Sequence, residues 1–214
     1  MHIDGLHSDP ALLRGFRSDI KRFLDQPGDG DARPCPGCNL TCPKCGSISC
    51  VCNCSPNCAD APRMMSSDPE EFPIEAAIVP LVYAFNSLRL TPPCWSCEGH
   101  YNKSGELDKL PRVWFNARSM AYPDLISELL SDLATARRLS LPWQVCVVCL
   151  DDSPDITFSI EPKINPTDKP ELKSLRRDVR IIADCLIADM KTKSSHRIHQ
   201  INQILNASEP PSNG

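Results

Sequence analysis

Cysteine is the residue type with the clearest chemistry in this sequence, and eight of the thirteen cysteines fall within residues 35–58. Thiolates bind zinc as a tetrahedron, and a Cys-x-x-Cys turn supplies two ligands to one ion because its sulfurs converge across a tight bend. Two such pairs follow each other with too few residues between them for a simple zinc ribbon. The cysteines that we expect to bind metal are Cys35, Cys38, Cys42, Cys45, Cys50, Cys52, Cys54 and Cys58.

The second half of this segment favours ions that share ligands. Its Cys-x-Cys-x-Cys run, residues 50–54, places successive sulfurs where they can bridge neighbouring ions. Eight thiolates match two tetrahedral zinc ions, or more ions if thiolates are shared. We therefore predict a zinc module, with an iron-sulfur cluster or structural disulfides as alternatives. A closed four-cysteine site leaves no open coordination position, so the module is expected to stabilise the fold or to present an interaction surface.

Part of the module resembles the radical SAM signature. Residues 37–45 contain a Cys-x3-Cys-x2-Cys loop made by Cys38, Cys42 and Cys45. In that family such a loop holds a four-iron cluster and leaves one iron open for S-adenosylmethionine. The resemblance implies an iron-sulfur cluster as the alternative cofactor. The downstream elements do not repeat as βα units, so a full catalytic barrel is not expected.

A second group of reactive side chains lies at Pro93-Cys94-Trp95-Ser96-Cys97-Glu98-Gly99-His100. Cys97 and His100 could act as nucleophile and base, or as metal ligands, with Glu98 as a proton acceptor. The structural alternative is a tight bend at Gly99 with buried, inert cysteines. An enzyme acting on a nucleotide or RNA through Cys97, Glu98 and His100 is therefore the alternative to a structural or interaction role.

The order helix, Ser-Cys-Glu-Gly-His, strand over residues 74–117 resembles a core of small uncharacterised bacterial and phage α/β proteins. It is also distantly similar to the tRNA wybutosine-synthesis methyltransferase family, whose related element is Ser-Cys-Ser-Gly-Arg. That resemblance implies methyl transfer to tRNA. Glu98 and His100 stand where that family has Ser and Arg.

Two distant Cys-x-x-Cys pairs could share one further zinc ion. They are Cys94 with Cys97 and Cys146 with Cys149. Side chains alternate along a strand, so the members of the second pair should point to opposite faces unless a bulge intervenes. We therefore favour buried structural thiols over a shared ion.

The elements that position these residues form an α+β domain over residues 70–206. We expect a small sheet of two hairpins in the order α-β-β-α-β-β-α, preceded by a helix over 10–24 with Asp9 as its N-cap. A helix from Ile74 to Leu88 should be kinked at Pro80. Pro123 should open a helix, residues 143–150 should form a central strand buried on both faces, and Pro170 to Leu205 should be one long helix or two in series.

The domain organisation follows from composition. We expect an N-terminal helix and linker at 1–34, the cysteine-rich metal-binding module at 35–58, the α+β domain at 70–206 and a disordered tail at 207–214.

Charge and hydropathy limit the class of protein. No apolar stretch of membrane-spanning length and no export signal are evident, so a cytoplasmic protein with free thiols is expected. The formal charge is −4, and two four-thiolate zinc sites would take it to about −8. General nucleic-acid binding is not favoured. We interpret the basic face of the last helix first as a solvated surface, with a protein or nucleic-acid partner surface as the alternative.

Overall fold

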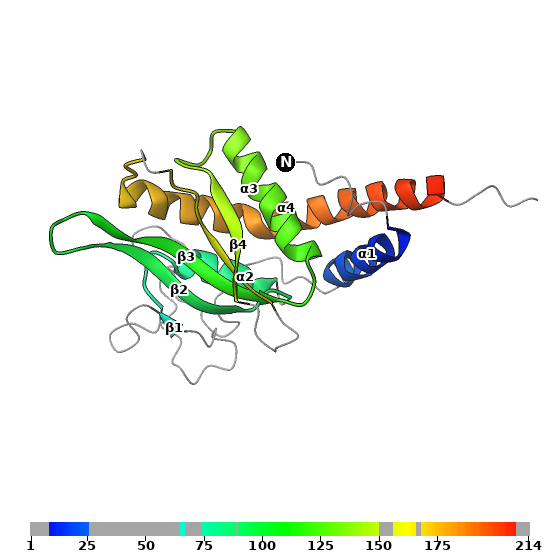
Figure 1. Ribbon diagram of the computed structural model, residues 1–214, viewed down its shortest axis with the longest axis horizontal. Helices are drawn as coiled ribbons and strands as arrows, with labels where there is room; N and C mark the ends of the chain where they lie inside the picture. The colour runs from blue at the N-terminus through cyan, green and yellow to red at the C-terminus, as the bar shows by residue number, and fades with distance from the viewer. Residues whose placement is uncertain are drawn as a thin grey trace, which may run out of the picture.

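The computed structural model contains both helices and strands and describes residues 9–25, 65–66, 74–88, 90–149, 156–165 and 168–208. The helices are α1 (Pro10–Asp25), α2 (Val79–Ser87), α3 (Ala121–Thr135) and α4 (Leu172–Ser208). The strands are β1 (Met65–Ser66), β2 (Pro93–Tyr101), β3 (Leu107–Ala117), β4 (Trp143–Cys149) and β5 (Ile156–Pro162). From α2 onward the order α-β-β-α-β-β-α is the predicted one (Figure 1).

Two segments of the predicted organisation lie wholly or partly outside the residues that the structure describes. Residues 35–58 lie outside it, so the metal-thiolate module stays a prediction. At the other end, α4 continues through Ser208 and therefore enters the region expected as a tail, 207–214, by two residues. The rest of that tail lies outside the described residues.

The sheet consists of two antiparallel hairpins, as predicted. β2 pairs with β3 and β4 pairs with β5, and antiparallel pairing of β3 with β5 joins the hairpins in the order β1-β2-β3-β5-β4. β5 therefore occupies the interior position, and the prediction of a central strand at 143–150 is wrong. β4 ends the sheet, with Val147 and Val148 53% and 38% exposed. β4 contacts α3, and Trp143 at its start is buried.

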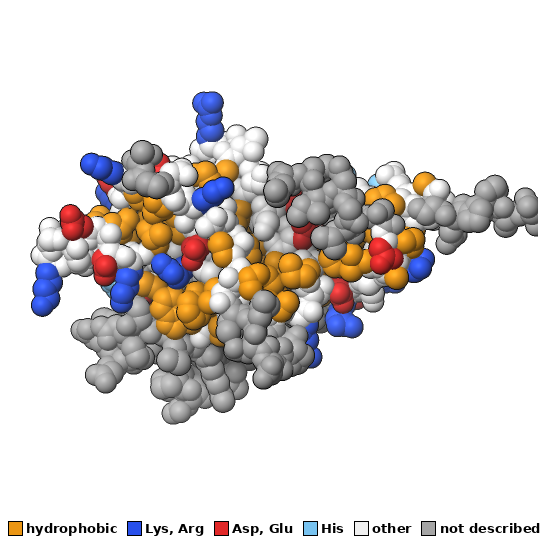
Figure 2. Space-filling view, in the orientation of Figure 1, with side chains coloured by type: hydrophobic (Ala, Val, Ile, Leu, Met, Phe, Trp, Pro, Cys, Tyr) orange, Lys and Arg blue, Asp and Glu red, His pale blue; other side chains and the backbone are white. Residues whose placement is uncertain are grey.

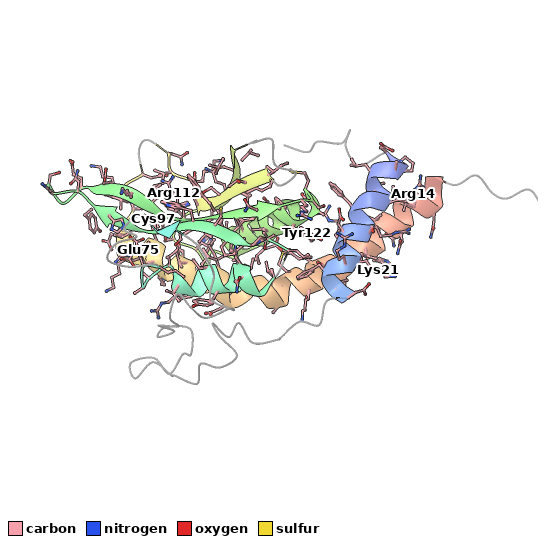
Figure 3. The ribbon with its side chains drawn as sticks, turned by 90° about the horizontal axis from the view of Figure 1, so that it is seen from below. Arg14, Lys21, Glu75, Cys97, Arg112 and Tyr122 are labelled. Atoms are coloured by element: carbon pink, nitrogen blue, oxygen red, sulfur yellow. The ribbon has the colours of Figure 1, made fainter. Side chains whose placement is uncertain are left out.

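One face of the sheet forms the core. Val113, Phe115 and Ala117 are buried and alternate along β3 with partly exposed residues, as the pleat of a strand requires. The Phe115 ring lies 4.6 Å from that of Phe85 in α2 and 5.6 Å from that of Phe158 in β5. Figure 3 shows α2 and α4 together on this side of the strands.

The opposite face carries a different apolar group. Trp114 alternates with Phe115 and so points away from the core, where its ring lies 4.7 Å from that of Trp95. Figure 2 shows hydrophobic side chains gathered across the middle of one broad face, with charged side chains around its margin and at the β2–β3 hairpin.

α4 is a single helix and runs along most of the molecule (Figure 1). Its 37 residues correspond to about 55 Å at a rise of ~1.5 Å per residue. It contacts α1, α2, α3, β2 and β3, so residues from every layer pack on it. Within the described parts of the chain, no helix combines the length and apolar composition that crossing a membrane requires.

Helix starts follow capping chemistry. The Asp9 carboxylate accepts a hydrogen bond from the Ala11 N–H at 2.8 Å, which confirms the predicted N-cap of α1. α2 begins only at Val79, which places Pro80 in its first turn. The missing N–H of Pro80 is harmless there, so the predicted kink does not occur. α3 begins at Ala121, two residues before the expected Pro123.

Candidate metal centre

The candidate site lies on the outer edge of β2. β1 covers this edge only at Trp95 and Ser96, through parallel pairing. At Glu98, further along the same edge, the Glu75 carboxylate is the partner of the strand backbone: its Oε2 accepts a hydrogen bond from the Glu98 N–H at 2.7 Å. The turn that precedes α2 therefore delivers a carboxylate to an edge that would otherwise expose an unpaired backbone donor.

Three side chains of different types converge at this edge. Glu75, Cys97 and His100 each offer one metal-ligand atom, and these atoms all lie within 4.8 Å of one another. The Glu75 Oε1 and His100 Nε2 atoms are 2.8 Å apart. The side chain of Glu75 is 5% exposed and that of His100 36%, while Cys97 is buried. Figure 3 shows Glu75 and Cys97 lying close together toward the hairpin end of β2.

This donor set is chemically suited to zinc. Zinc accepts thiolate sulfur, imidazole nitrogen and carboxylate oxygen at ~2.0–2.3 Å, which places ligand atoms about 3.5 Å apart in a tetrahedron. Atoms already within 4.8 Å of one another need only small side-chain movements to reach that spacing. Three protein ligands also leave a fourth position for water or another molecule, unlike a closed four-cysteine site.

Gly99 shapes the strand between two of the donors. Its φ is +83°, a left-handed conformation that residues with a Cβ adopt only at a cost, and it lies between Cys97 and His100. A Cβ at this position would lie 2.6 Å from Leu172 Cδ1 and 2.8 Å from Pro111 Cδ. The Gly99 N–H donates a hydrogen bond to the Cys97 sulfur at 3.4 Å. The glycine thus permits both this backbone conformation and the close approach of α4.

Glu98, expected as a proton acceptor, has other partners. Its Oε1 accepts a hydrogen bond from Arg176 Nη2 at 2.6 Å, and its Oε2 accepts one from the Ala77 N–H at 2.7 Å. His100 faces Glu75 instead. The structure therefore brings Cys97 and His100 together as predicted, places Glu98 in a separate ion pair, and adds Glu75.

The structure argues against the alternative in which the two distant cysteine pairs share one ion. Cys94 and Cys97 lie on β2, whereas residues 146 and 149 lie on β4, and β3 and β5 stand between these strands. Three steps of ~4.8 Å separate β2 from β4 by about 14 Å, which no single ion can bridge. Burial raises the pKa of the Cys94 and Cys146 thiols, which keeps them neutral near pH 7.

The basic residues of α4 are partly used within the fold. Lys193 contacts Glu128 and Asp132 of α3, and Arg197 contacts Asp124 and Glu128. These contacts join α4 to α3. Part of the face that we predicted as a partner surface is therefore an internal helix-helix contact.

Comparison of this chain with known proteins found no match. No protein-family model matches it. No curated protein and no solved structure matches it either.

Glu75 is the one member of the group that the sequence did not indicate. It stands 22 positions before Cys97 and outside any spacing typical of metal ligands. The available signal was a lone acidic residue in the apolar run from Ile74 to Val82, where a buried carboxylate needs a partner.

Proposed function

We propose that this protein is a zinc-binding protein in which Glu75, Cys97 and His100 hold one ion. The observation that carries the proposal is the convergence of three different donor atoms within 4.8 Å on a mostly buried edge. Sulfur, nitrogen and oxygen together favour zinc over magnesium or calcium, which prefer oxygen ligands alone.

The role that we infer for this ion is structural. Its ligands come from the turn before α2 and from β2, so the ion would tie that turn to the edge of the sheet. Cys97 is only 1% exposed, which disfavours attack by its sulfur on a substrate. The eight cysteines of residues 35–58 would hold further zinc, or an iron-sulfur cluster, and stabilise or present an interaction surface. This part of the proposal rests on their spacing.

An enzyme acting on a nucleotide or RNA is the second candidate. The observation that favours it is the incomplete ligand set, because an ion with three protein ligands can activate a bound water. His100, at 36% side-chain exposure, is the ligand that reaches solvent. The pairing of Glu98 with Arg176 assigns that carboxylate to positioning the strand.

Metal content of matched variants tests the proposal. Protein purified without oxygen should contain zinc, and His100→Asn and Cys97→Ser should each lose about one ion per chain relative to the parent. Cys94→Ser is the control, since Cys94 lies on the same strand outside the donor group. Replacing zinc by cobalt in the parent should add thiolate-to-cobalt absorption that Cys97→Ser reduces and Cys94→Ser leaves unchanged.

The outcomes separate the alternatives. Equal metal content in the parent, His100→Asn and Cys94→Ser would disprove the three-ligand site, whatever residues 35–58 bind. A brown protein with stoichiometric iron and sulfide would show that the cysteine module holds an iron-sulfur cluster and not zinc. Far-ultraviolet circular dichroism on each variant separates loss of the ion from loss of the fold.

A further inference from the structure

A hollow of about 530 Å³ lies between α1 and the last third of α4, far from the Glu75 site. Figure 3 shows α1, with Arg14 and Lys21, crossing α4 at the end of the molecule away from the β2–β3 hairpin. The volume is within the range of pockets that accept small organic ligands. Leu24 and Ile198 supply apolar lining from the two helices.

Three cations line this hollow from one face of α1. Arg14, Arg17 and Lys21 are spaced by three and four residues, which places them on adjacent turns of the same helix face. They span about 10 Å along the axis at ~1.5 Å per residue. Among the described residues, Asp25 is the one acidic member of the lining, so three positive charges face one negative charge there.

Several cations elsewhere in the fold already have a carboxylate partner. Arg176, Lys193 and Arg197 each lie within ion-pair distance of a carboxylate. Within the described ranges, neither Arg14 nor Lys21 has an ion pair. Among the described residues of this chain of net charge −4, Arg14 and Lys21 therefore add unbalanced positive charge to the lining of the hollow.

Arg17 is held in place by a neutral partner. Its Nη1 donates a hydrogen bond to Asn202 Oδ1 of α4 at 3.0 Å. This contact orients the guanidinium without neutralising its charge, so the positive charge stays available to an anion in the hollow. Ser18 adds a hydroxyl to the same lining.

We propose that this hollow binds a small organic diphosphate, of the kind carried by a nucleoside diphosphate. Guanidinium groups match phosphate oxygens with paired hydrogen bonds, and lysine adds a further charge. Two linked phosphate groups match three cations in charge, and the apolar lining at Leu24 and Ile198 suits the non-phosphate part of the ligand. The proposal is independent of the metal site.

Binding of ADP and inorganic pyrophosphate to the full chain, measured by calorimetry at about 0.05 M and 0.15 M salt, tests it. We expect one site per chain and an affinity that falls as salt rises. The double variant Arg14→Gln/Lys21→Gln should weaken both ligands at least ten-fold, which is about 1.4 kcal/mol. Lys103→Gln/Lys163→Gln removes the same charge at exposed positions elsewhere and should leave both affinities unchanged.

Each outcome decides the proposal. Absence of binding, or equal weakening by both double variants, would overturn it. Equal affinity for citrate would show that the hollow selects charge alone and would also overturn it. Tight binding of a single-stranded RNA without binding of ADP or pyrophosphate would assign the hollow to nucleic acid instead. The metal content of the Arg14→Gln/Lys21→Gln protein should equal that of the parent. A failure of the diphosphate proposal therefore does not bear on the zinc proposal.

Discussion

Arg176 clamps Glu98 through both side chain and backbone. Its Nη2 lies 2.6 Å from Glu98 Oε1, and its Nε lies 3.2 Å from the Glu98 carbonyl oxygen. The same Nη2 donates to the Gly99 carbonyl oxygen at 2.8 Å. One guanidinium from the start of α4 therefore fixes the segment of β2 that lies between the donors Cys97 and His100.

Arg176→Ala should destabilise the protein by about 1–3 kcal/mol, because it leaves a partly buried carboxylate and two carbonyl groups without this donor. Urea unfolding measures the loss. Arg177→Ala is the neighbouring control: its side chain is 64% exposed and lies 3.8 Å from its acidic partner, Asp178. Its effect should be below about 0.5 kcal/mol. Equal losses for the two variants would contradict the clamp.

Gly99→Ala should cost about 2–4 kcal/mol, since a Cβ there adds left-handed backbone strain to a collision with Leu172 and Pro111. Gly105 provides a matched control because its φ is also +83° but nothing lies within 4 Å of the place that a Cβ would occupy. Gly105→Ala should therefore cost only about 1 kcal/mol, the strain alone. A thermal or urea unfolding series on both variants separates the two contributions, and similar values would show that packing against α4 is unimportant.

The phenol of Tyr122 predicts a loss of stability at high pH. Its hydroxyl donates to the Asp19 carbonyl oxygen at 2.9 Å, and burial, with the Asp19 charge, raises the pKa of Tyr122 from 10.0 to about 12. Between these values the unfolded chain releases the proton while the folded chain keeps it, so stability should fall as pH rises across this window. Tyr122→Phe should remove that part of the pH dependence, measured by urea unfolding from pH 9 to about 12. An unchanged slope in the variant would refute this assignment.

Asp178 should be one of the most sensitive positions in α4. Its side chain is fully buried and accepts hydrogen bonds from the Ser140 N–H and hydroxyl and from Trp143 Nε1. Asp178→Asn removes the charge and part of the accepting capacity, so a loss of about 2–4 kcal/mol is expected. Asp184→Asn changes an exposed residue of the same helix and should have little effect. Unfolding of both variants at the same urea concentration would contradict this role for Asp178.

Periodicity predicted the elements well where one face of an element is buried. The apolar spacing of α1 and of Leu172, Leu175, Val179 and Ile182 in α4 corresponds to buried residues in the structure. The two hairpins were predicted because polar turns separate short β-branched and aromatic segments. These patterns are local, so they predict a helix or a strand without any information on what that element contacts.

Long-range relationships could not be predicted in the same way. The apolar sequence of β4 suggested a central strand, yet the order of strands depends on the pairing of β3 with β5, which no local pattern encodes. Pro80 is compatible with a kink or with a first turn, and only the start of α2 decides between them. Glu75 lies beside Cys97 and His100 because the turn before α2 contacts the edge of β2. The spacing of these residues in the sequence does not predict that contact.

The contacts between Arg176 and Glu98 can form only late in synthesis of the chain. Arg176 follows Glu98 by 78 residues. At ~5–20 residues per second, a ribosome needs about 4–16 s to pass from one to the other. During that interval the chain contains β2, and then β3, without the helix that covers Gly99 and fixes Glu98. The contacts of Arg176 that fix the strand between Cys97 and His100 therefore form late in synthesis. A ribosome that stalls before α4 would hold a chain in which this edge of β2 lacks those contacts.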